Sequence, residues 1–534
     1  MNLDLASPGR SFEAARAHAN AGDLKPAMEA ARQAAKADPT NSEAFAIWGV
    51  ALAEMGEFAE ALEPLTVAAD RAPAGSVGWA NLNSQLGRSL SNMGFWARAM
   101  ARLAPIERLS PPDPMVRQRL GAAFMRMNLV ERGLPHLQWA ARARPDGPTL
   151  RFDLGLALLS AGRPREAETE LNAALALDPA MLRAHMATAN LRRSTPEANH
   201  VDRLVAARES PGLDPVERAE LGFPLFKELD DLGRVAEAWP VLEEANEVAR
   251  TSLPPWSARD DHDLVEALIE RFPIEAFASL PAAADGARIP VFIVGLPRTG
   301  TTLVERILAA HSQVAAMGEL PTFPMMFRGA AEGVDRRSLN AALVRATAGA
   351  DWPAVGVQFQ AETAFLAQGA RFTIDKLPLN SPLIGAIRLA FPNARIIHLE
   401  RNPMDALFSA YRVRFSGQYG WSYRQAEMAA HYANHVRLMD HWRACLGEGL
   451  IEVVYEDLVA DPEPQIRRLL DACGLAFEPA CLRPHETPGA VLTASITQVR
   501  SPITAAGVGG WRRYAARLEP LRAALEAMGV GSDT

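Results

Sequence analysis

The chain has 534 residues, of which 49% are hydrophobic and 22% charged, and its formal net charge is -8. This composition is typical of globular proteins, and the length predicts two or more domains. Because acidic residues outnumber basic ones, no global positive field attracts nucleic acid, although a local basic cleft could still bind a small anion. Nucleic acid is therefore not an expected partner.

Three cysteines, Cys445, Cys473 and Cys481, lie far apart and form no CxxC pair. Their spacing and odd number disfavour a disulfide framework and a thiolate zinc site, so no metal is expected and a reducing cytoplasm is predicted. The first twenty residues lack the apolar stretch of a signal peptide, and no apolar run is long enough to span a bilayer. We expect a cytoplasmic protein without a membrane span.

The first half of the chain repeats a pattern of about 34 residues. Each unit has a turn residue, a small residue a few positions later and a closing proline. Glycine ends a first helix in the left-handed conformation, a small residue lets a second helix pack closely, and proline stops it. The turn residues are Gly22, Gly56, Gly94, Asn128 and Gly162; the small residues are Ala27, Ala61, Ala99, Gly133 and Ala167; the prolines are Pro39, Pro73, Pro111, Pro145 and Pro179.

This period resembles that of the tetratricopeptide repeat family over residues 10–195, and weaker helical units, one of them around Gly233 and Ala238, continue to about residue 250. The resemblance implies an all-α solenoid over residues 1–250. Most of its apolar side chains are expected to pack between repeats, because a single repeat cannot bury its own face. Its concave groove is expected to bind a peptide or protein partner.

Proline-rich and small residues at 251–288 predict a linker, followed by a second domain over residues 289–534. Residues 289–294 form a continuous β-branched and aromatic run, which predicts a buried parallel strand. A loop at 295–302 and a helical pattern follow. Strand, glycine-bracketed loop and helix start together predict an anion cradle in an α/β domain with a parallel sheet.

The loop differs from the nucleoside triphosphatase pattern GxxxxGK[ST] at one position. Gly295, Gly300 and Thr302 are in place, but Thr301 occupies the lysine position. A triphosphate clamp without its lysine is a poor nucleoside triphosphatase, whereas Arg298 offers a cation to a shorter phosphoryl or sulfuryl group.

A second segment, residues 394–411, reads as a strand, a turn and a helix start. Arg401 directly follows the strand and Ser409 comes eight residues later. A guanidinium fork with a hydroxyl on the following helix suits a phosphomonoester. The alternative is an arginine ion pair and a surface serine.

Together these segments resemble sulfotransferases that use 3′-phosphoadenosine 5′-phosphosulfate, over about residues 290–515. The likeness is closest to the tyrosylprotein branch and to bacterial proteins that join tetratricopeptide repeats to a sulfotransferase domain. It implies a P-loop-type sulfotransferase fold that binds this donor and its product, adenosine 3′,5′-bisphosphate. The implied donor ligands are Arg298, Thr299, Gly300, Thr301, Thr302, Arg401 and Ser409.

The resemblance also implies residues for the transfer step. Glu319 matches the general base of the tyrosylprotein branch, and Lys376 matches its lysine near the transferred group, where it could stabilise the bridging oxygen. The alternatives are a helix-capping carboxylate for Glu319 and an ion pair with Asp375 for Lys376. His311 is a rival base, but its place at the end of an apolar helix favours a structural histidine.

Further matches lie towards the C-terminus. Ser495 is the candidate catalytic hydroxyl in a segment that closes over the cofactor, although the spacing leaves Thr497 open. Arg500 and Tyr455 are candidate cofactor ligands, and Trp511 stacks or packs nearby. For these residues core packing competes with ligand contact.

The sequence therefore predicts an enzyme that transfers a sulfuryl group to a hydroxyl on a protein tyrosine, glycan or small molecule, with repeats that position substrate or partner. The animal tyrosylprotein enzymes are membrane-anchored and carry disulfides, whereas this chain shows neither feature. The resemblance therefore does not by itself imply a protein-tyrosine substrate. The alternatives are an inactive scaffold that binds a partner protein and a nucleotide-dependent phosphotransferase. Acceptor and oligomeric state stay open, because fold-level likeness supplies no substrate.

Overall fold

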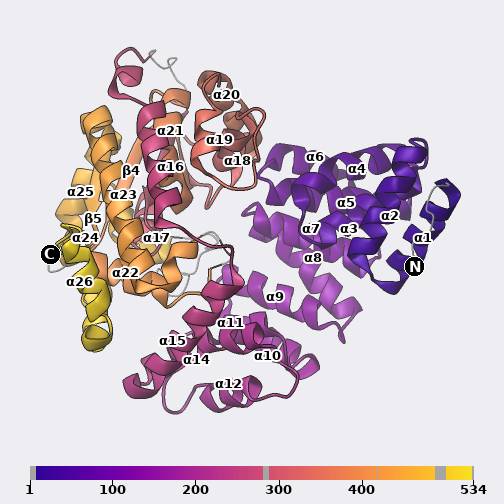
Figure 1. Cartoon of the computed structure of the whole chain (residues 1–534), viewed down its shortest axis with the longest axis horizontal. Helices are drawn as coiled ribbons and strands as arrows, with labels where there is room; N and C mark the ends of the chain where they lie inside the picture. The colour runs from indigo at the N-terminus through magenta and orange to yellow at the C-terminus, as the bar shows by residue number, and fades with distance from the viewer. Residues whose placement is uncertain (1–7, 281–287, 416, 418, 488–500, 532–534) are drawn as a thin grey trace. The chain divides into compact units, whose positions relative to one another are not determined.

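The computed structural model describes residues 8–280, 288–415, 417, 419–487 and 501–531 (Figure 1). Contacts divide the chain into two compact units. The first contains residues 1–163 with Ala361–Phe365, and the second contains Pro164–Gln360 with Leu366–Thr534. The division into units rests on contacts within the folded chain and does not locate independently folding domains. The predicted linker at residues 251–288 therefore stays a prediction.

The first unit is a stack of helices that pack mostly against helices next to them or next but one in sequence. It confirms the predicted helical solenoid. Its helices are α1 (Pro8–Ala21), α2 (Leu24–Ala37), α3 (Ser42–Glu54), α4 (Phe58–Arg71), α5 (Val77–Asn92), α6 (Trp96–Leu109), α7 (Pro114–Arg126), α8 (Val130–Ala143) and α9 (Pro148–Ser160).

The repeated residues do what their chemistry predicts. Gly22 and Gly56 lie between paired helices with φ of +81° and +84°, and Asn128 takes the same place in a later unit with φ of +61°. At Gly133 an added Cβ would come within 2.9 Å of the carbonyl oxygen of Gly121, so only glycine permits this helix contact. Each closing proline lies two residues after the last residue of the second helix of its pair.

The second unit begins with more helices. The pair α14 and α15 is separated by Gly233, whose φ is +73°, and Ala238 is fully buried between them. The pattern of the repeats therefore continues in weakened form. These helices are α10 (Pro164–Leu177), α11 (Leu182–Ala189), α12 (Val201–Arg208), α13 (Pro215–Glu220), α14 (Gly222–Asp231), α15 (Val235–Ser252) and α16 (Ala258–Arg271).

A five-stranded parallel sheet with the order β2-β3-β1-β4-β5 forms the centre of the second unit. The strands are β1 (Ile289–Gly295), β2 (Val314–Ala316), β3 (Phe372–Lys376), β4 (Arg395–Glu400) and β5 (Leu450–Val454). Except for β2 they are short and mostly buried, as strands covered on both faces require, although β3 and β4 also contain buried polar residues. The predicted parallel α/β domain is confirmed.

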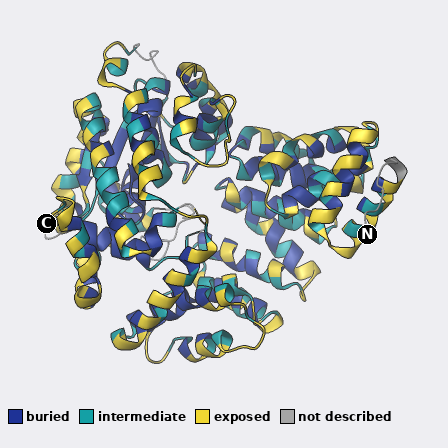
Figure 2. Cartoon of the chain, viewed as in Figure 1, coloured by how far each residue is buried: buried dark blue, intermediate teal, exposed yellow. Residues whose placement is uncertain are grey.

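Helices cover both faces of the sheet, which is dark blue between them in Figure 2. Val291 and Ile293 point into a cluster with residues of α17, α24 and α25. Phe292 points the other way and lies against Phe323 and Phe359 at ring distances of 5.9 and 5.8 Å. The helices from β1 onwards are α17 (Thr301–Ala309), α18 (Thr322–Gly329), α19 (Ala341–Arg345), α20 (Trp352–Thr363), α21 (Ile384–Ala390), α22 (Pro403–Tyr411), α23 (Gln425–Leu446), α24 (Tyr455–Ala460), α25 (Pro462–Cys473) and α26 (Glu519–Ala527).

The helical start of the second unit shares a core with its C-terminal part. Phe226 of α14 lies 6.5 Å from Phe408 of α22 and 5.9 Å from Tyr514, and Trp239 of α15 lies 5.7 Å from Tyr514, measured between ring centroids. Tyr514 belongs to the short helix η10 (Gly510–Arg517). Burial of these rings joins three segments that are far apart in sequence.

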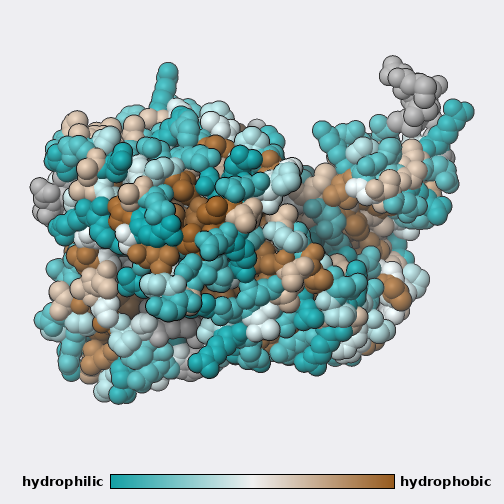
Figure 3. All heavy atoms as spheres, turned by 90° about the horizontal axis from the view of Figure 1, so that it is seen from below, coloured by the Kyte–Doolittle hydropathy of each residue, from teal (hydrophilic) through white to brown (hydrophobic). Residues whose placement is uncertain are grey.

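Hydrophilic side chains cover most of the face drawn in Figure 3. Among the described residues, no helix combines the length and hydrophobicity that a membrane crossing requires.

Candidate functional site

Each of the five strands ends beside a residue or segment that the sequence singled out. The loop at residues 295–302 follows β1, Glu319 follows β2, Lys376 ends β3, Arg401 follows β4 and Tyr455 follows β5. Because the strands are parallel, their carboxyl ends meet at one edge of the sheet. The chain leaves β1 towards β2 and leaves β4 towards β5, so these central strands flank the crevice where open α/β sheets bind ligands.

The loop after β1 has an unusual backbone. Gly295, Arg298 and Gly300 have φ of +145°, +72° and +103°. A Cβ at residue 300 would come within 2.5 Å of the Tyr455 ring, and one at residue 295 within 2.8 Å of the Leu399 carbonyl oxygen. Both glycines are therefore required by close contacts, and the left-handed Arg298 marks local strain of the kind found at binding loops.

The loop runs directly into α17. Thr299 is buried and its Oγ1 donates a hydrogen bond of 2.8 Å to the Leu296 carbonyl, which closes the turn. Gly300 is the N-cap, and Thr301 and Thr302 form the first turn. The first N–H groups of a helix have no intrahelical acceptor, and the helix dipole is positive there, so this end favours an anion.

Arg401 is held against the loop. Its Nη1 donates to the Arg298 carbonyl at 2.8 Å, its Nη2 donates to the Gly507 carbonyl, and its guanidinium lies 4.7 Å from the Tyr455 ring centroid. Arg298 Nε in turn donates to Ser409 Oγ at 3.3 Å. Within the described residues, the buried Nε of Arg401 has no hydrogen-bond partner.

Arg412 adds a third guanidinium. Burial, and then the positive charges of Arg412 and Arg401, lower the pKa of Arg298 to about 10. Burial also lowers the pKa of Arg412, whose Nη1 lies 3.2 Å from Asp230. Three neighbouring guanidinium groups repel one another, and a bound phosphate or sulfate would relieve this repulsion.

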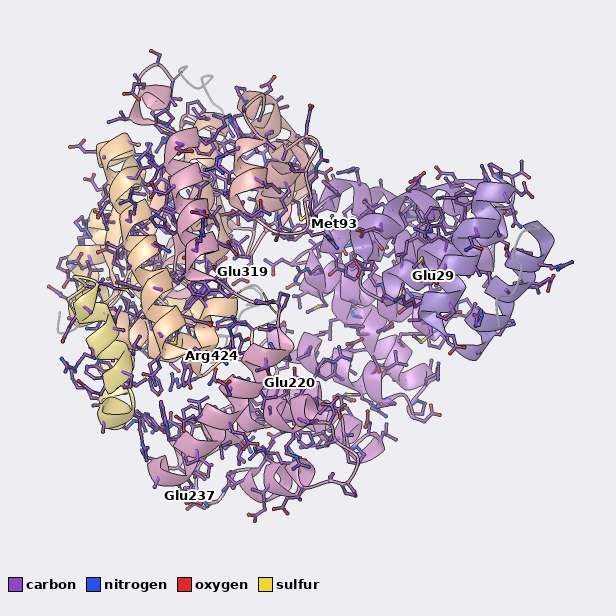
Figure 4. The ribbon with its side chains drawn as sticks, viewed as in Figure 1. Glu29, Met93, Glu220, Glu237, Glu319 and Arg424 are labelled. Atoms are coloured by element: carbon purple, nitrogen blue, oxygen red, sulfur yellow. The ribbon has the colours of Figure 1, made fainter. Side chains whose placement is uncertain are left out.

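Glu319 and Lys376 form an ion pair at the other side of the sheet edge. Lys376 Nζ donates to Glu319 Oε1, and Glu305 Oε2 of α17 lies 3.9 Å from the same Nζ. The Lys376 side chain is 1% exposed, whereas that of Glu319, labelled in Figure 4, is 39% exposed. A buried cation thus meets a carboxylate that solvent or a substrate can reach.

Backbone hydrogen bonds that continue the β2–β3 pairing past the end of β2 bring the side chains of Glu319 and Lys376 together. The Met317 N–H donates to the Ile374 carbonyl at 2.9 Å, and the Lys376 N–H donates to the Gly318 carbonyl at 3.0 Å. Asp375 Oδ1 accepts from the Leu320 N–H at 3.3 Å, and burial raises the pKa of Asp375 well above its ordinary value. The register of β2 against β3 therefore sets the position of the Glu319 carboxylate.

The segment after residue 501 is tied to the start of α22. Asp405 accepts hydrogen bonds from the Gly509 N–H at 2.6 Å and the Trp511 N–H at 3.3 Å. Trp511 is mostly buried in the shared core, which is a packing role. Ser495, Thr497 and Arg500 lie outside the described residues, so their assignments stay predictions.

His311 is a structural residue, as its position suggested. Its ring is buried, its Nε2 donates to the Ala476 carbonyl at 2.9 Å, and its Nδ1 accepts from the Gln313 N–H at 3.1 Å. With both nitrogens bonded to the backbone, this imidazole is not placed to accept a substrate proton.

A cavity of about 70 Å³ lies between β4 and α23 and is lined in part by Thr299 and Arg401. His398, Glu400 and Glu452 beside it have ligand atoms within 4.8 Å of one another. Arg443 pairs with both carboxylates, at 2.7 Å for Glu452. The two carboxylates thus already share a cation, and we interpret this cluster as an ion-pair network.

The sequence patterns did not single out Glu305, Asp405, Arg412 or Asp230. Arg412 follows Ser409 by three residues, a spacing that places two helical residues on one side, and this could have identified it. Glu305 lies within an apolar helical pattern, where a lone carboxylate is a signal. Nothing local distinguishes Asp230 from other acidic residues of the repeats.

Comparison with known proteins finds matches in both parts of the chain. Residues 290–479 match the model of a sulfotransferase family, and residues 119–181 and 152–196 match the tetratricopeptide repeat model. An uncharacterized protein of Aquifex aeolicus is 30% identical over 379 residues, which cover 68% of this chain and 48% of the relative.

A protein-tyrosine sulfotransferase of Drosophila melanogaster is 26% identical over 245 residues, which cover 41% of this chain and 46% of the relative. The chain thus spans about half the length of each of these two relatives. The sulfotransferase domain of the Synechococcus PCC 7002 olefin synthase aligns with 47% of this chain and 99% of its own, at 21% identity and a TM-score of 0.32.

Proposed function

Because this chain joins tetratricopeptide repeats to a domain of the sulfotransferase family, we propose that it transfers a sulfuryl group from 3′-phosphoadenosine 5′-phosphosulfate to a hydroxyl acceptor. One observation carries the proposal. The three-arginine cluster at Arg298, Arg401 and Arg412 lies at the same sheet edge as the pair of Glu319 and Lys376. This edge of the sheet therefore has cations that can bind an anion and a carboxylate that can accept a proton.

Two groups of residues would hold the donor. The loop at residues 295–302 and the start of α17 offer backbone N–H groups and a helix dipole to the 5′-phosphosulfate. Arg401 and Ser409 would bind the 3′-phosphate, with the buried Arg401 Nε as a donor that lacks a partner among the described residues. Tyr455 would contribute through its packing against Gly300 and Arg401.

The donor supplies the sulfuryl group, and the chain supplies a base and a cation. Glu319 would take the proton of the acceptor hydroxyl as the acceptor oxygen bonds to sulfur. The bond between sulfur and the phosphate oxygen breaks, and its electron pair remains on that oxygen. Lys376 would donate a hydrogen bond to this oxygen as its negative charge develops.

Sulfuryl transfer fits the loop better than nucleoside triphosphate chemistry. Thr301 occupies the position of the lysine that clamps β- and γ-phosphates in triphosphatases. The lysine at this sheet edge comes instead from the end of β3, where it pairs with Glu319.

The repeats would bind a peptide or protein partner and so deliver or position the acceptor. The acceptor class is a hydroxyl on a protein tyrosine, a glycan or a small molecule. The compartment we propose is the cytoplasm, since three unpaired cysteines suit a reducing environment.

Calorimetric titration of adenosine 3′,5′-bisphosphate into the full chain tests the donor site. We expect micromolar binding that Arg401→Ala weakens at least about tenfold, the effect of losing one charged hydrogen-bond donor. Arg467→Ala is the matched control, because Arg467 pairs with Glu463 on the surface of α25. Binding of ATP but not of the bisphosphate would favour a phosphotransferase, and binding of neither would favour an inactive scaffold.

A further inference from the structure

Lys376 is flanked by two carboxylates, and only one of them has a place in the proposed chemistry. Glu305 lies one turn into α17, and its Oε2 is 3.9 Å from Lys376 Nζ. Its side chain is 8% exposed, against 39% for Glu319. The lysine therefore has an inner partner that solvent barely reaches and an outer one that a substrate can contact.

A carboxylate at position 305 is costly and is not needed for packing. Its helix neighbours Val304 and Ile307 are fully buried apolar residues of the sheet core. Burial raises the pKa of Glu305, the nearby charge of Glu319 raises it further, and the charge of Lys376 opposes both effects. A buried carboxylate persists in such a place when it holds a specific partner.

The proposed reaction changes the charge around Lys376. When Glu319 takes the acceptor proton it becomes neutral, and the ammonium loses its outer partner at the moment when it must face the leaving oxygen. The Glu305 side chain is almost completely buried, so it does not take the acceptor proton and keeps its own negative charge in this step. It remains as the fixed partner of the ammonium.

We propose that Glu305 is a positioning residue that holds the Lys376 ammonium in place while Glu319 accepts the proton. This inference rests on the proposed function. In this proposal Glu305 contacts neither donor nor acceptor, so it affects turnover only by positioning Lys376. The other ionisable groups that face it, among the described residues, are Asp375 on β3 and Arg306 on its own helix.

Steady-state kinetics of Glu305→Gln test this role. We expect kcat to fall about tenfold, the equivalent of one weakened charge interaction, while the affinity for adenosine 3′,5′-bisphosphate changes less than about twofold. Glu305→Asp keeps the charge on a shorter side chain and should give an intermediate kcat. Glu228→Gln is the control for loss of a buried, ion-paired carboxylate elsewhere, since Glu228 pairs with His200 in the helical region.

A double-mutant cycle decides whether the effect passes through Lys376. In a Lys376→Ala background, Glu305→Gln should cause no further loss of kcat, because the group that Glu305 holds is gone. An equal loss in both backgrounds would overturn the inference, as would an unchanged kcat in Glu305→Gln and Glu305→Asp. If the unmodified chain transfers no sulfuryl group at all, the proposed function itself fails, and the two failures are thus distinguishable.

Discussion

The hydroxyl of Tyr514 donates a hydrogen bond of 2.9 Å to Asp230, a residue 284 positions earlier in the chain. The same carboxylate lies 3.2 Å from Arg412 Nη1 and 3.0 Å from Arg513 Nη2. Asp230 therefore joins α14, the end of α22 and η10, and it neutralises Arg412 at the edge of the arginine cluster. Among the described residues, the side-chain partners Arg412, Arg513 and Tyr514 lie outside the helical region to which Asp230 belongs.

Replacement of Asp230 by Ala leaves two arginines and a buried hydroxyl without their acceptor. Because both guanidinium groups keep partial solvent contact, we expect a loss of about 2 kcal/mol in the free energy of unfolding. Because the arginine cluster also loses the carboxylate that neutralises Arg412, we expect tighter binding of adenosine 3′,5′-bisphosphate. Urea unfolding and calorimetry measure the two effects. Glu237→Ala, which removes an exposed ion pair on α15, should change neither. Equal behaviour of the two variants would refute the linking role of Asp230.

Replacement of Gly300 by Ala tests the loop geometry. The new Cβ would lie 2.5 Å from the Tyr455 ring, and residue 300 has φ of +103°, a conformation that alanine adopts only at a cost. We expect a destabilisation of about 1–3 kcal/mol and a loss of bisphosphate binding. Tyr455→Ala added to Gly300→Ala removes the clash but leaves the strain, so binding should return only in part. Full binding in the single variant would contradict this geometry.

The buried carboxyl of Asp375 predicts a dependence of stability on pH. Burial raises its pKa well above 3.8, so the folded protein keeps a proton that the unfolded chain releases. Stability contributed by this group is therefore lost as the pH rises above about 4. Asn380 and the Leu320 N–H can also bond to an amide at this position, so Asp375→Asn should be tolerated.

The measurement is urea unfolding of both proteins between about pH 4 and pH 7. The difference in free energy between Asp375→Asn and the unmodified chain should move in favour of the variant as the pH rises. A constant difference across this range would show that Asp375 is equally protonated in the folded and unfolded states.

Local patterns predicted most of the fold. The helix pairs follow from a turn residue with positive φ, a small contact residue and a proline, all within one 34-residue frame. Four of the five strands are short runs that contain two or more buried apolar residues. The fifth, β2, has only three partly buried residues and no such run, so its existence depends on pairing with β3.

The sequence predicted those parts of the candidate site whose polar residues directly follow a strand within one segment. The loop at residues 295–302, Arg401 and Ser409, and Lys376 each follow a recognisable strand, and the structure brings these segments to one edge of the sheet. Their roles in binding and catalysis stay predictions. Asp230 could not be found in this way, because its partners Tyr514 and Arg412 are distant in sequence and only folding brings them together.

In the proposed function, this edge of the sheet transfers a sulfuryl group with Glu319 as the base. The most direct measurement is the release of adenosine 3′,5′-bisphosphate from 3′-phosphoadenosine 5′-phosphosulfate by the full chain, with a tyrosine-containing peptide, a simple phenol and a sugar alcohol as acceptors. We expect release that depends on an acceptor, and a loss of about 100-fold or more in Glu319→Gln with bisphosphate binding unchanged. Equal release by the unmodified chain and Glu319→Gln would contradict the account.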